Sequence, residues 1–522
     1  MESREEKALE LFQLARSFHG QYQGTEAPKL GDLEKAITLY KEALSWLPPE
    51  HSRRLQFLAG LGAACDARRT QTGQLEHLND SITVHREAIA LIPPENRNRP
   101  NALAGLADIL FLRYERTSQL EHLNEAIFLH REALALRNAH WSSQGVDITL
   151  QDLADTLVAR FKHTGQIEDV DEAISLLCDA TTLVGSKNAQ RSSLLHHGLA
   201  IAYNRRFSST SQHQDINQSI DHYRESLALC PPADAHPRRS GLLNGLAVAL
   251  DTRFRLTGLR QDSDESIAFH RAAVASLPAR HPDRPDVLNG LAEALHQRFE
   301  QTGQFEDVDE AVSLRRDALA MQPLPHPRRY ESLGGLANTT LSRFRHAKRL
   351  EDINESITLH RELLSLPHPD RYKCLGGLAN ALIARFETVG HAEDIDDAIQ
   401  LHHEVLALQP QPHPLRYRTL SGLAGAHVAR FEKTSQPHDL HQAIVLRREV
   451  IELLAPTHPT RLRFLLRLSE VLDLEFHLGG QVGDVEELIK LFHEILYLMP
   501  ETDPRREDVH NELQAVLAFS KS

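Results

Sequence analysis

The chain has 522 residues, of which 41% are hydrophobic and 25% are charged, a composition typical of a folded, water-soluble protein. Its 58 basic and 72 acidic side chains give a net charge of -14, which argues against a nucleic-acid-binding surface. The four cysteines (Cys65, Cys178, Cys230 and Cys374) lie far apart and form no C-x-x-C pair, so we expect neither a disulfide framework nor a zinc site.

The amino-terminal segment is charged, and no apolar stretch follows it, so we expect no signal peptide. No apolar run approaches the ~20 residues that a membrane-spanning helix needs. Together with the scattered cysteines, these features predict a soluble, cytoplasmic protein that does not associate with membranes.

From the amino-terminal end onward, leucine returns at a nearly constant step of 42 to 47 residues, and a small residue follows it each time. A period of this size is typical of a stack of identical helical units, in which each unit contacts only its neighbours. The leucines are Leu14, Leu61, Leu106, Leu153, Leu199, Leu246, Leu291, Leu336, Leu378, Leu423 and Leu468.

Residues 286–326 illustrate one repeat. The apolar stripe of a first helix is formed by Leu288, Leu291, Ala292, Leu295 and Phe299. The helix is predicted to break at Gly303, and Asp307 is predicted as the N-cap of a second helix, with Glu310 completing a capping box. The second helix is predicted to end near Pro323.

The same aspartate recurs at the predicted start of the second helix in nine repeats: Asp32, Asp169, Asp215, Asp262, Asp307, Asp352, Asp394, Asp439 and Asp484. Each repeat is therefore predicted to be an antiparallel pair, helix A followed by helix B. Residues 503–520 hold one further apolar helix, which is predicted to cap the end of the stack. The sequence thus predicts a repeat region over 1–500 and a capping helix with a tail over 501–522.

Helix B carries a small residue, a larger residue four positions later and often a proline near its end, as in Ala36, Tyr40, Ala43 and Pro48. Together with the leucine and small residue of helix A, this pattern resembles the tetratricopeptide repeat. The family's unit has 34 residues, whereas this one averages about 45, with about seven residues added at the hairpin tip and about four between repeats.

The lengthened repeat resembles the tetratricopeptide arrays of fungal proteins that accompany CHAT-type protease or NTPase modules. This resemblance covers essentially the whole chain. It implies an all-α fold, a right-handed α-solenoid of about eleven antiparallel helix pairs plus a C-terminal capping helix.

An arginine followed by an aromatic residue ends helix A in eight repeats: Arg113-Tyr114, Arg160-Phe161, Arg206-Phe207, Arg253-Phe254, Arg298-Phe299, Arg343-Phe344, Arg385-Phe386 and Arg430-Phe431. One interpretation is a row of guanidinium groups that grips a polyanion. We favour the other, in which the ring fills the hairpin tip and the arginine reaches an acid at the start of helix B, because acids recur in phase with the arginines. The predicted partners are Glu121, Glu168, Glu306, Glu351 and Glu393.

A His-Pro pair recurs between repeats, at His236, His281, His326, His368, His413 and His458. Equivalent loops in a stack of helices lie about 10 Å apart, too far to share one metal ion at ~2 Å. We therefore predict rigid connectors, in which proline restricts its own φ and the residue before it. No metal site is predicted.

The sequence contains no phosphate-binding loop, no nucleophile elbow and no dinucleotide-binding turn. We therefore predict that the protein is not an enzyme and carries no cofactor. If a pocket within the solenoid were catalytic, Glu293 and His296, one helical turn apart, would be the nearest candidates.

Function is expected on the inner face of helix A, which lines the groove in tetratricopeptide arrays. The resemblance places eleven candidate ligand-binding residues there: Asn244, Asp251, Asn289, Glu293, His296, Asn338, Lys373, Asn380, Arg418, Arg463 and Arg467. Asn380, Arg463 and Arg467 match part of the carboxylate clamp with which some family members hold chaperone C-termini. Gly376 and Gly422 occupy its other positions, so the implied clamp is incomplete.

We predict a non-catalytic scaffold that binds a protein or peptide, possibly an acidic one, in a basic groove near the C-terminal end. No nucleic-acid or membrane partner is predicted. Two alternatives stay open. One is an enzyme with a pocket inside the solenoid. The other is the sensor arm of a CHAT-protease or NTPase immune-type system whose effector is a separate protein.

Overall fold

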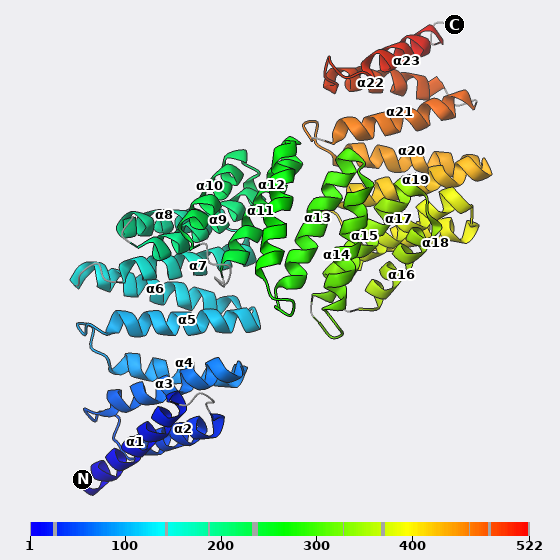
Figure 1. Ribbon diagram of the computed structural model, residues 1–522. Coiled ribbons are helices and arrows are strands. Elements are labelled where there is room, and N and C mark those ends of the chain that lie inside the picture. Colours follow the sequence, from blue (N-terminus) through cyan, green and yellow to red (C-terminus); the bar gives the residue numbers. More distant parts are fainter. Residues whose placement is uncertain are drawn as a thin grey trace. The chain divides into compact units, whose positions relative to one another are not determined.

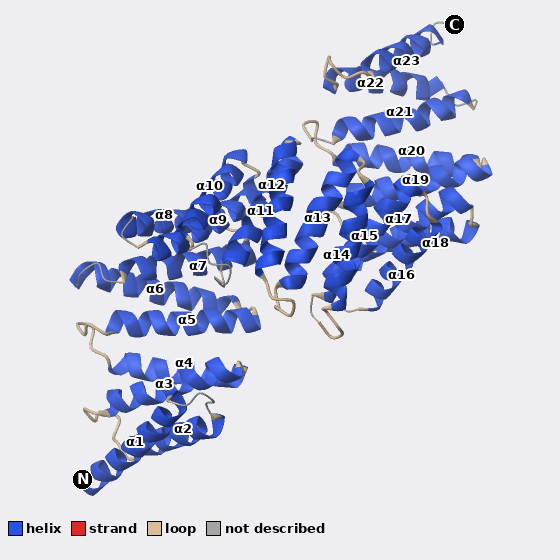
Figure 2. Cartoon of the chain, viewed as in Figure 1, coloured by secondary structure: helices blue, strands red, loops and turns tan. Residues whose placement is uncertain are grey.

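The computed structural model describes residues 2–24, 29–140, 145–185, 188–231, 238–326, 328–366, 371–458, 460–478 and 482–519. Within these residues the fold consists of 23 helices and contains no strand (Figures 1 and 2). Consecutive helices pack against each other as antiparallel pairs, which confirms the predicted all-α solenoid of eleven helix pairs followed by a single C-terminal helix. Odd-numbered helices up to α21 are helix A, and even-numbered helices are helix B.

The chain forms two compact bodies, residues 1–276 and residues 277–522. The N-terminal body contains α1 (Glu2–Gln23), α2 (Leu30–Ser45), α3 (Arg54–Thr72), α4 (Leu75–Leu91), α5 (Arg99–Thr117), α6 (Leu120–His140), α7 (Val146–Thr164), α8 (Ile167–Val184), α9 (Ala189–Thr210), α10 (His213–Leu229), α11 (Arg239–Thr257) and α12 (Arg260–Ser276).

The C-terminal body contains α13 (Arg284–Thr302), α14 (Phe305–Ala320), α15 (Arg329–Ala347), α16 (Leu350–Ser365), α17 (Arg371–Val389), α18 (Ala392–Leu408), α19 (Arg416–Thr434), α20 (Pro437–Leu453), α21 (Arg461–His477), α22 (Val482–Leu498) and α23 (Arg506–Phe519). The unpaired helix α23 packs against α22. The sequence-based division at residue 500 stays a prediction.

The hairpin tip between helix A and helix B repeats one local structure. In the seventh repeat, Gly303 has a φ of 70°, which lets the chain leave α13 through a left-handed residue. The hydroxyl of Thr302 donates to the carbonyl of Arg298 at 2.8 Å and accepts from the N–H of Gln304 at 3.4 Å. The predicted break at Gly303 is therefore confirmed.

The aspartates predicted as N-caps are not caps. Helix B begins three residues earlier, so that Gln304 is the N-cap of α14 and Asp307 is the third helical residue. The side chain of Gln304 makes no capping hydrogen bond among the described residues. An aspartate N-cap with a glutamate at N3 gives the spacing D-x-x-E, and so does an aspartate at N3 with a glutamate three residues later. The sequence pattern does not distinguish these two registers, and the predicted one was wrong.

Seven of these nine aspartates instead bind the arginine at the end of helix A. Arg298 reaches Asp307 with Nε–Oδ2 at 2.8 Å and Nη2–Oδ1 at 2.7 Å. Seven repeats share this bidentate pair, with the carboxylate no more than 5% exposed, at Asp169, Asp215, Asp262, Asp307, Asp352, Asp394 and Asp439. In these seven repeats the structural interpretation of the arginines was correct. The partner is the aspartate that follows the predicted Glu168, Glu306, Glu351 or Glu393, whereas Glu121 is followed by His122.

The same arginines also tie each repeat to the one before it. Nη1 of Arg430 donates to Asp396 of the preceding helix B at 2.7 Å, and Nη1 of Arg253 donates to Asn217 at 3.1 Å. Equivalent acceptors are Asn124, Asp171, Asp309 and Asn354. We call this series of contacts the arginine ladder.

The connectors after His281, His326, His413 and His458 contain a repeated hydrogen-bonded turn, and their rigidity stays a prediction. Nδ1 of His281 accepts the N–H of Asp283 at 3.2 Å, and His326, His413 and His458 accept equivalent bonds at 3.2–3.3 Å. His236 and His368 lie outside the described residues.

An arginine three residues after the connector histidine then opens the next helix A. Nη1 of Arg461 donates to the carbonyls of Ile451 and Leu454 at 2.9 and 2.6 Å, and its Nε donates to Glu494 at 2.7 Å. A cation is favourable at a helix C-terminus, so this side chain stabilises the joint between repeats.

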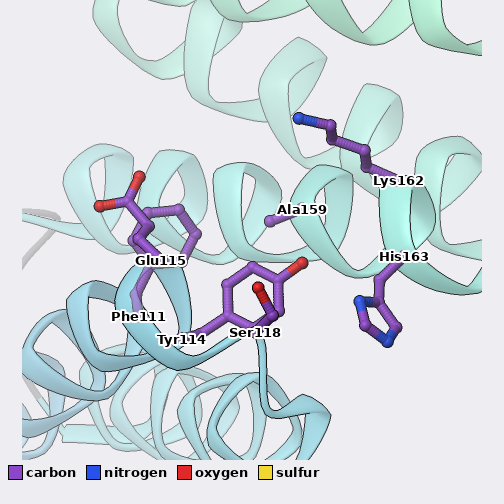
Figure 3. Close-up of a pocket in the computed structure, with 7 residues that line it drawn as sticks. All are labelled: Phe111, Tyr114, Glu115, Ser118, Ala159, Lys162 and His163. Atoms are coloured by element: carbon purple, nitrogen blue, oxygen red, sulfur yellow. The ribbon is translucent and has the colours of Figure 1, made fainter. Parts of the chain in front are cut away.

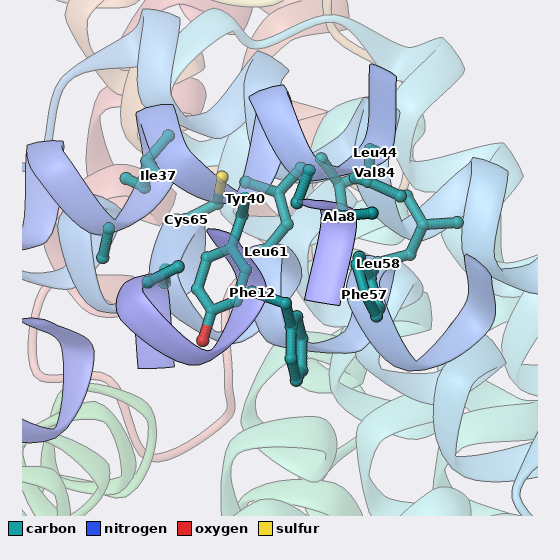
Figure 4. Packing of buried hydrophobic residues seen from close by; sticks show 14 of the residues in the cluster. Ala8, Phe12, Ile37, Tyr40, Leu44, Phe57, Leu58, Leu61, Cys65 and Val84 are labelled. Atoms are coloured by element: carbon teal, nitrogen blue, oxygen red, sulfur yellow. The ribbon is translucent and has the colours of Figure 1, made fainter. Parts of the chain in front are cut away.

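The core is a series of clusters between neighbouring helices rather than one centre. Figure 4 shows the first of them, in which Phe12, Tyr40, Phe57 and Leu61 from α1, α2 and α3 pack together. The rings of Phe12 and Phe57 stack with their centroids 4.2 Å apart. Burial raises the pKa of the Cys65 thiol in this cluster to about 11, so this cysteine stays a neutral, apolar side chain.

Candidate functional site

Helix B side chains reach toward the inner face of helix A through glycines. A Cβ at Gly422 would lie 2.7 Å from Cε1 of His402, and a Cβ at Gly245 would lie 2.6 Å from the ring of Tyr223. Gly335 and Gly377 are closed in the same way by Arg315 and His360. These glycines directly precede the periodic leucines of helix A, a signal present in the sequence that the prediction did not use.

In the C-terminal body, α17 lies between α15 and α19 (Figure 1). A groove of about 350 Å³ opens along α17. We call it the α17 groove. It is lined by Asn338, Tyr372, Lys373, Gly376, Gly377, Asn380, His402, Val405, Gln409, Leu415, Arg418 and Thr419. Two of these side chains are cationic, and none of the described lining residues is acidic.

Four of the eleven predicted ligand-binding residues come together in this groove: Asn338, Lys373, Asn380 and Arg418. All four are exposed. The ammonium of Lys373 lies 5.7 Å from the ring centre of Tyr372, and the guanidinium of Arg418 lies 5.8 Å from that of Tyr417. Nε of Arg418 also donates to the hydroxyl of Tyr417 at 3.1 Å, so an aromatic residue orients each cation.

The floor of the groove comes from helix B and from the next helix A. Oγ1 of Thr419 donates to Oε1 of the buried Gln409 at 2.8 Å. The ring of His402 is 3% exposed, and neither of its nitrogens has a hydrogen-bond partner among the described residues. Burial, with a smaller contribution from His403, lowers the pKa of His402 to about 4, so its ring is neutral at pH 7.

Five predicted residues lie outside the groove, and three of them take part in contacts between helices. Asp251 accepts from Nε2 of the buried His270 at 3.2 Å, and Nδ2 of Asn289 donates to Oγ of Ser332 at 2.7 Å. Glu293 pairs with Nη2 of Arg315 at 2.5 Å. Asn244 on α11 and His296 on α13 are partly buried.

Arg463 and Arg467 are exposed on α21 and do not line the α17 groove. The backbone carbonyl of Arg467 accepts a hydrogen bond from Arg447 of α20, at the position where other repeats have glycine. These two arginines therefore do not line the same groove as Asn380. The three residues that match the carboxylate clamp of the family do not form one site.

Glu293 and His296 do not form a poised acid–base pair. Burial raises the pKa of Glu293, but Arg315, Gln297 and His296 together outweigh burial and leave that pKa below its ordinary value. Burial lowers the pKa of His296, whose Nε2 lies 3.4 Å from Glu300. At neutral pH this pairing gives an ionised carboxylate already held by arginine and a neutral imidazole, which does not suit proton transfer between them.

A second cavity, of about 450 Å³, lies in the N-terminal body where the arginine ladder is irregular. Figure 3 shows Phe111, Tyr114 and Glu115 of α5 facing Lys162 and His163 of α7. Nine residues after Arg113, where other repeats place the ladder aspartate, this repeat has His122.

Three carboxylates cluster on α5 and α7 of the N-terminal body. Burial raises the pKa of Asp108, and burial together with Asp108 and Asp155 raises the pKa of Asp152 to about 7. Burial also raises the pKa of Asp155.

Among the described residues, no group of three or more histidine, cysteine, aspartate or glutamate side chains is arranged to hold a metal ion. No described helix is long and apolar enough to cross a bilayer.

No known protein family and no curated protein matches this sequence. Solved structures with a similar helical architecture include human IFIT1 in a dimer with PPP-AAAA, with 13% identity over 89% of this chain and 90% of that chain and a TM-score of 0.47. A Podosopora anserina putative kinesin light chain with TPR-like repeats is 24% identical over 41% of this chain and 97% of its own, with a TM-score of 0.31. The Cut9–Hcn1 hetero-tetramer of APC/C shows 13% identity over 98% and 96%, with a TM-score of 0.37.

Proposed function

We propose that this protein is a non-catalytic scaffold that binds an acidic peptide segment of a partner protein in the α17 groove. The observation that carries the proposal is the lining of the groove, where Lys373 and Arg418 stand beside Asn338 and Asn380 without a described acidic side chain. In a chain whose net charge is -14, a groove whose described lining carries only cationic charge marks a place where the overall charge pattern reverses.

A peptide ligand suits this groove better than a nucleic acid. Two cations can neutralise two carboxylates, whereas nucleic-acid binding relies on many phosphate contacts and is opposed here by the net charge of -14. The asparagines supply amide donors and acceptors for a peptide backbone. Arg463 and Arg467 of α21 would contact the bound peptide only where it extends beyond the α17 groove.

We also propose a more specific type of repeat array for this chain. The spacing of Ala36, Tyr40, Ala43 and Pro48 and the lengthened hairpin support a long tetratricopeptide-type array of the fungal kind in a cytoplasmic protein. Such an array can serve as a scaffold by itself or as the sensor arm of a separate CHAT-type or NTPase effector.

If the proposal is correct, Lys373 and Arg418 attract the acidic peptide to the groove. A fluorescein-labelled, amidated hexaglutamate peptide should bind the wild-type chain, and Lys373→Glu with Arg418→Glu should weaken binding at least about tenfold, because two attractive charges become repulsive. Fluorescence polarisation at low salt measures the dissociation constants.

The matched control is Arg361→Glu with Lys433→Glu, two exposed basic residues of the same body that do not line the groove. This variant has the same net charge and should bind within about twofold of wild type. Equal weakening in both variants, or the absence of hexaglutamate binding to wild type, contradicts the proposal. So does tighter binding of an RNA oligonucleotide with the same number of charges.

A further inference from the structure

Helix B carries one residue per repeat that reaches the inner face, and in four repeats this residue meets an acid of its own helix A. In two of them the acid stands two residues after the periodic leucine, where Asp108 lies 3.8 Å from Nε2 of His130 and Glu293 lies 2.5 Å from Nη2 of Arg315. In the other two the acid stands one turn further along the same helix, as in Asp251 with His270 at 3.2 Å and Asp66 with His85 at 3.5 Å.

The repeats that form the α17 groove depart from this rule. The reaching residues are His360 and His402, and the positions equivalent to Asp108 and Glu293 hold Asn338 and Asn380. The alternative positions one turn later hold Leu341 and Ile383. Two neighbouring repeats have therefore lost the acid at both places, and both asparagines line the groove.

His360 and His402 lack the acidic partner that the equivalent residue has in the four repeats above. Both are buried, at 2% and 3% exposure, and all four ring nitrogens have no hydrogen-bond partner among the described residues. His402 itself lines the groove, and the ring of His360 packs directly behind Gly377, which also lines it. A buried imidazole with no partner is unfavourable, and a ligand acceptor placed over it relieves that cost.

We infer that the α17 groove holds a segment with two carboxylates three residues apart, one over Asn338 and one over Asn380 and His402. The inference rests on the proposed function and names its ligand class more closely. Each ligand carboxylate occupies the place that an aspartate or glutamate of the chain itself occupies in other repeats, and Lys373 and Arg418 balance the added charge.

The spacing follows from geometry. Helices packed side by side lie about 10 Å apart, and α15 packs directly against α17. A peptide in the polyproline II conformation rises about 3.1 Å per residue with three residues per turn, so side chains three residues apart point the same way, about 9 Å from each other. An acid-x-x-acid segment therefore matches the two positions.

The test uses three fluorescein-labelled, amidated peptides of glycine and serine, which contain a single glutamate, two adjacent glutamates or two glutamates three residues apart. The wild-type chain should bind the last of them at least about fivefold more tightly than either other peptide. Amidation removes the terminal carboxylate, so the side-chain carboxylates alone are compared.

The decisive variant is Asn380→Asp, which restores the acid that other repeats carry and places it over His402. It should reduce binding of the spaced peptide to that of the single-glutamate peptide and remove the preference for spacing, while the thermal midpoint stays the same or rises. Asn354→Asp is the matched control, because that ladder position accepts from Arg385 and is aspartate in neighbouring repeats.

If Asn380→Asp keeps the spacing preference, or wild type shows none, the inference is wrong. When the hexaglutamate experiment succeeds but this one does not, the acidic-peptide groove stands and only the two-carboxylate assignment falls. Failure of hexaglutamate to bind wild type removes both.

Discussion

Single glycines set how closely helix B approaches the inner face. At Gly422 the ring of His402 occupies the space of a side chain, whereas Gly425, one turn later on the same helix, has no neighbouring atom within 4 Å of a built Cβ among the described residues. Packing therefore requires a glycine at position 422, whereas at position 425 glycine has no packing role and is a poor helix former.

Gly422→Ala should destabilise the protein by about 1–3 kcal/mol, because the new methyl group displaces a buried ring in a packed region. Gly425→Ala should have the opposite sign, up to about 1 kcal/mol of stabilisation, because alanine is the better helix former. Thermal midpoints of the two variants check the prediction. Equal midpoints would show that the ring of His402 is free to move, and His402→Ala should lessen the effect of Gly422→Ala.

At the scale of elements, the ladder arginines hold helix A to its own helix B and to the helix B before it. Arg253 illustrates the arrangement, with two bonds to the buried Asp262 and one to Asn217. Exposed ion pairs between successive B helices, such as Arg86 with Glu125 at 2.6 Å, have similar distances but remain in water. Burial of the carboxylate should make the first kind of pair far more strongly coupled than the second.

A double-mutant cycle of Arg253→Ala and Asp262→Ala should give a coupling free energy of about 2–4 kcal/mol, since each single variant leaves its partner without its counter-charge. The same cycle at Arg86 and Glu125 should give about 0.5 kcal/mol or less. Chemical denaturation followed by circular dichroism supplies the four stabilities. A ladder coupling no larger than the surface coupling would contradict the role given to the arginines.

Across the whole molecule, the titratable groups with shifted pKa values differ between the two bodies. The C-terminal body has His360 and His402, whose pKa values burial lowers to about 4. The N-terminal body has His130 and His197, with pKa values also lowered by burial to about 4, and in addition Asp108, Asp152 and Asp155 with raised pKa values. Acidification therefore affects the two bodies differently.

A buried histidine with a pKa of about 4 is protonated in the unfolded chain but not in the folded one between pH 6.5 and 4. Stability from it is complete above pH 6.5 and falls by up to about 1.4 kcal/mol per pH unit as the pH drops through that window. The three aspartates act in reverse, since a folded pKa above the unfolded value favours the folded state on acidification.

Hydrogen exchange at pH 7.5 and 5.5, corrected for intrinsic rates, should therefore show protection falling more in α15–α19 than in α5–α7. A variant with His360→Gln and His402→Gln should lose most of this pH dependence in the C-terminal body. Equal loss of protection in both bodies, or an unchanged response in the variant, would contradict the assignment.

The sequence period was enough to predict the helix pairs, because burial repeats with ten of the eleven leucines. Leu14 is the exception, at 49% exposure, and the neighbouring Ala15 is buried in its place. Leu288, Leu291, Leu295 and Phe299 are all at most 4% exposed, as the stripe required. The start of helix B was missed by three residues, since the partner of Asp307 is an arginine on another helix and not its own backbone. Such a choice depends on a three-dimensional partner that local spacing does not name.

The groove was predictable only in part. The helix A register identified Asn338, Lys373, Asn380 and Arg418, but His402 and Gln409 come from helix B and line the groove only because Gly422 and its neighbours let them approach. Glu293 and Asn289 have the same register as groove residues, yet partners on adjacent helices already hold them. Which inner-face residue is available is decided by its neighbours and not by its position.

The arginine ladder also bears on how such a chain can change in length. Its acceptor on the preceding helix B is asparagine in some repeats and aspartate in others, and the arginine binds both. Repeats that carry the ladder can therefore follow one another with this contact intact, so we expect duplication or deletion of one whole period to be tolerated better than that of a partial one. Inner-face residues could then be exchanged together with a complete repeat while the arginine contact between repeats is kept.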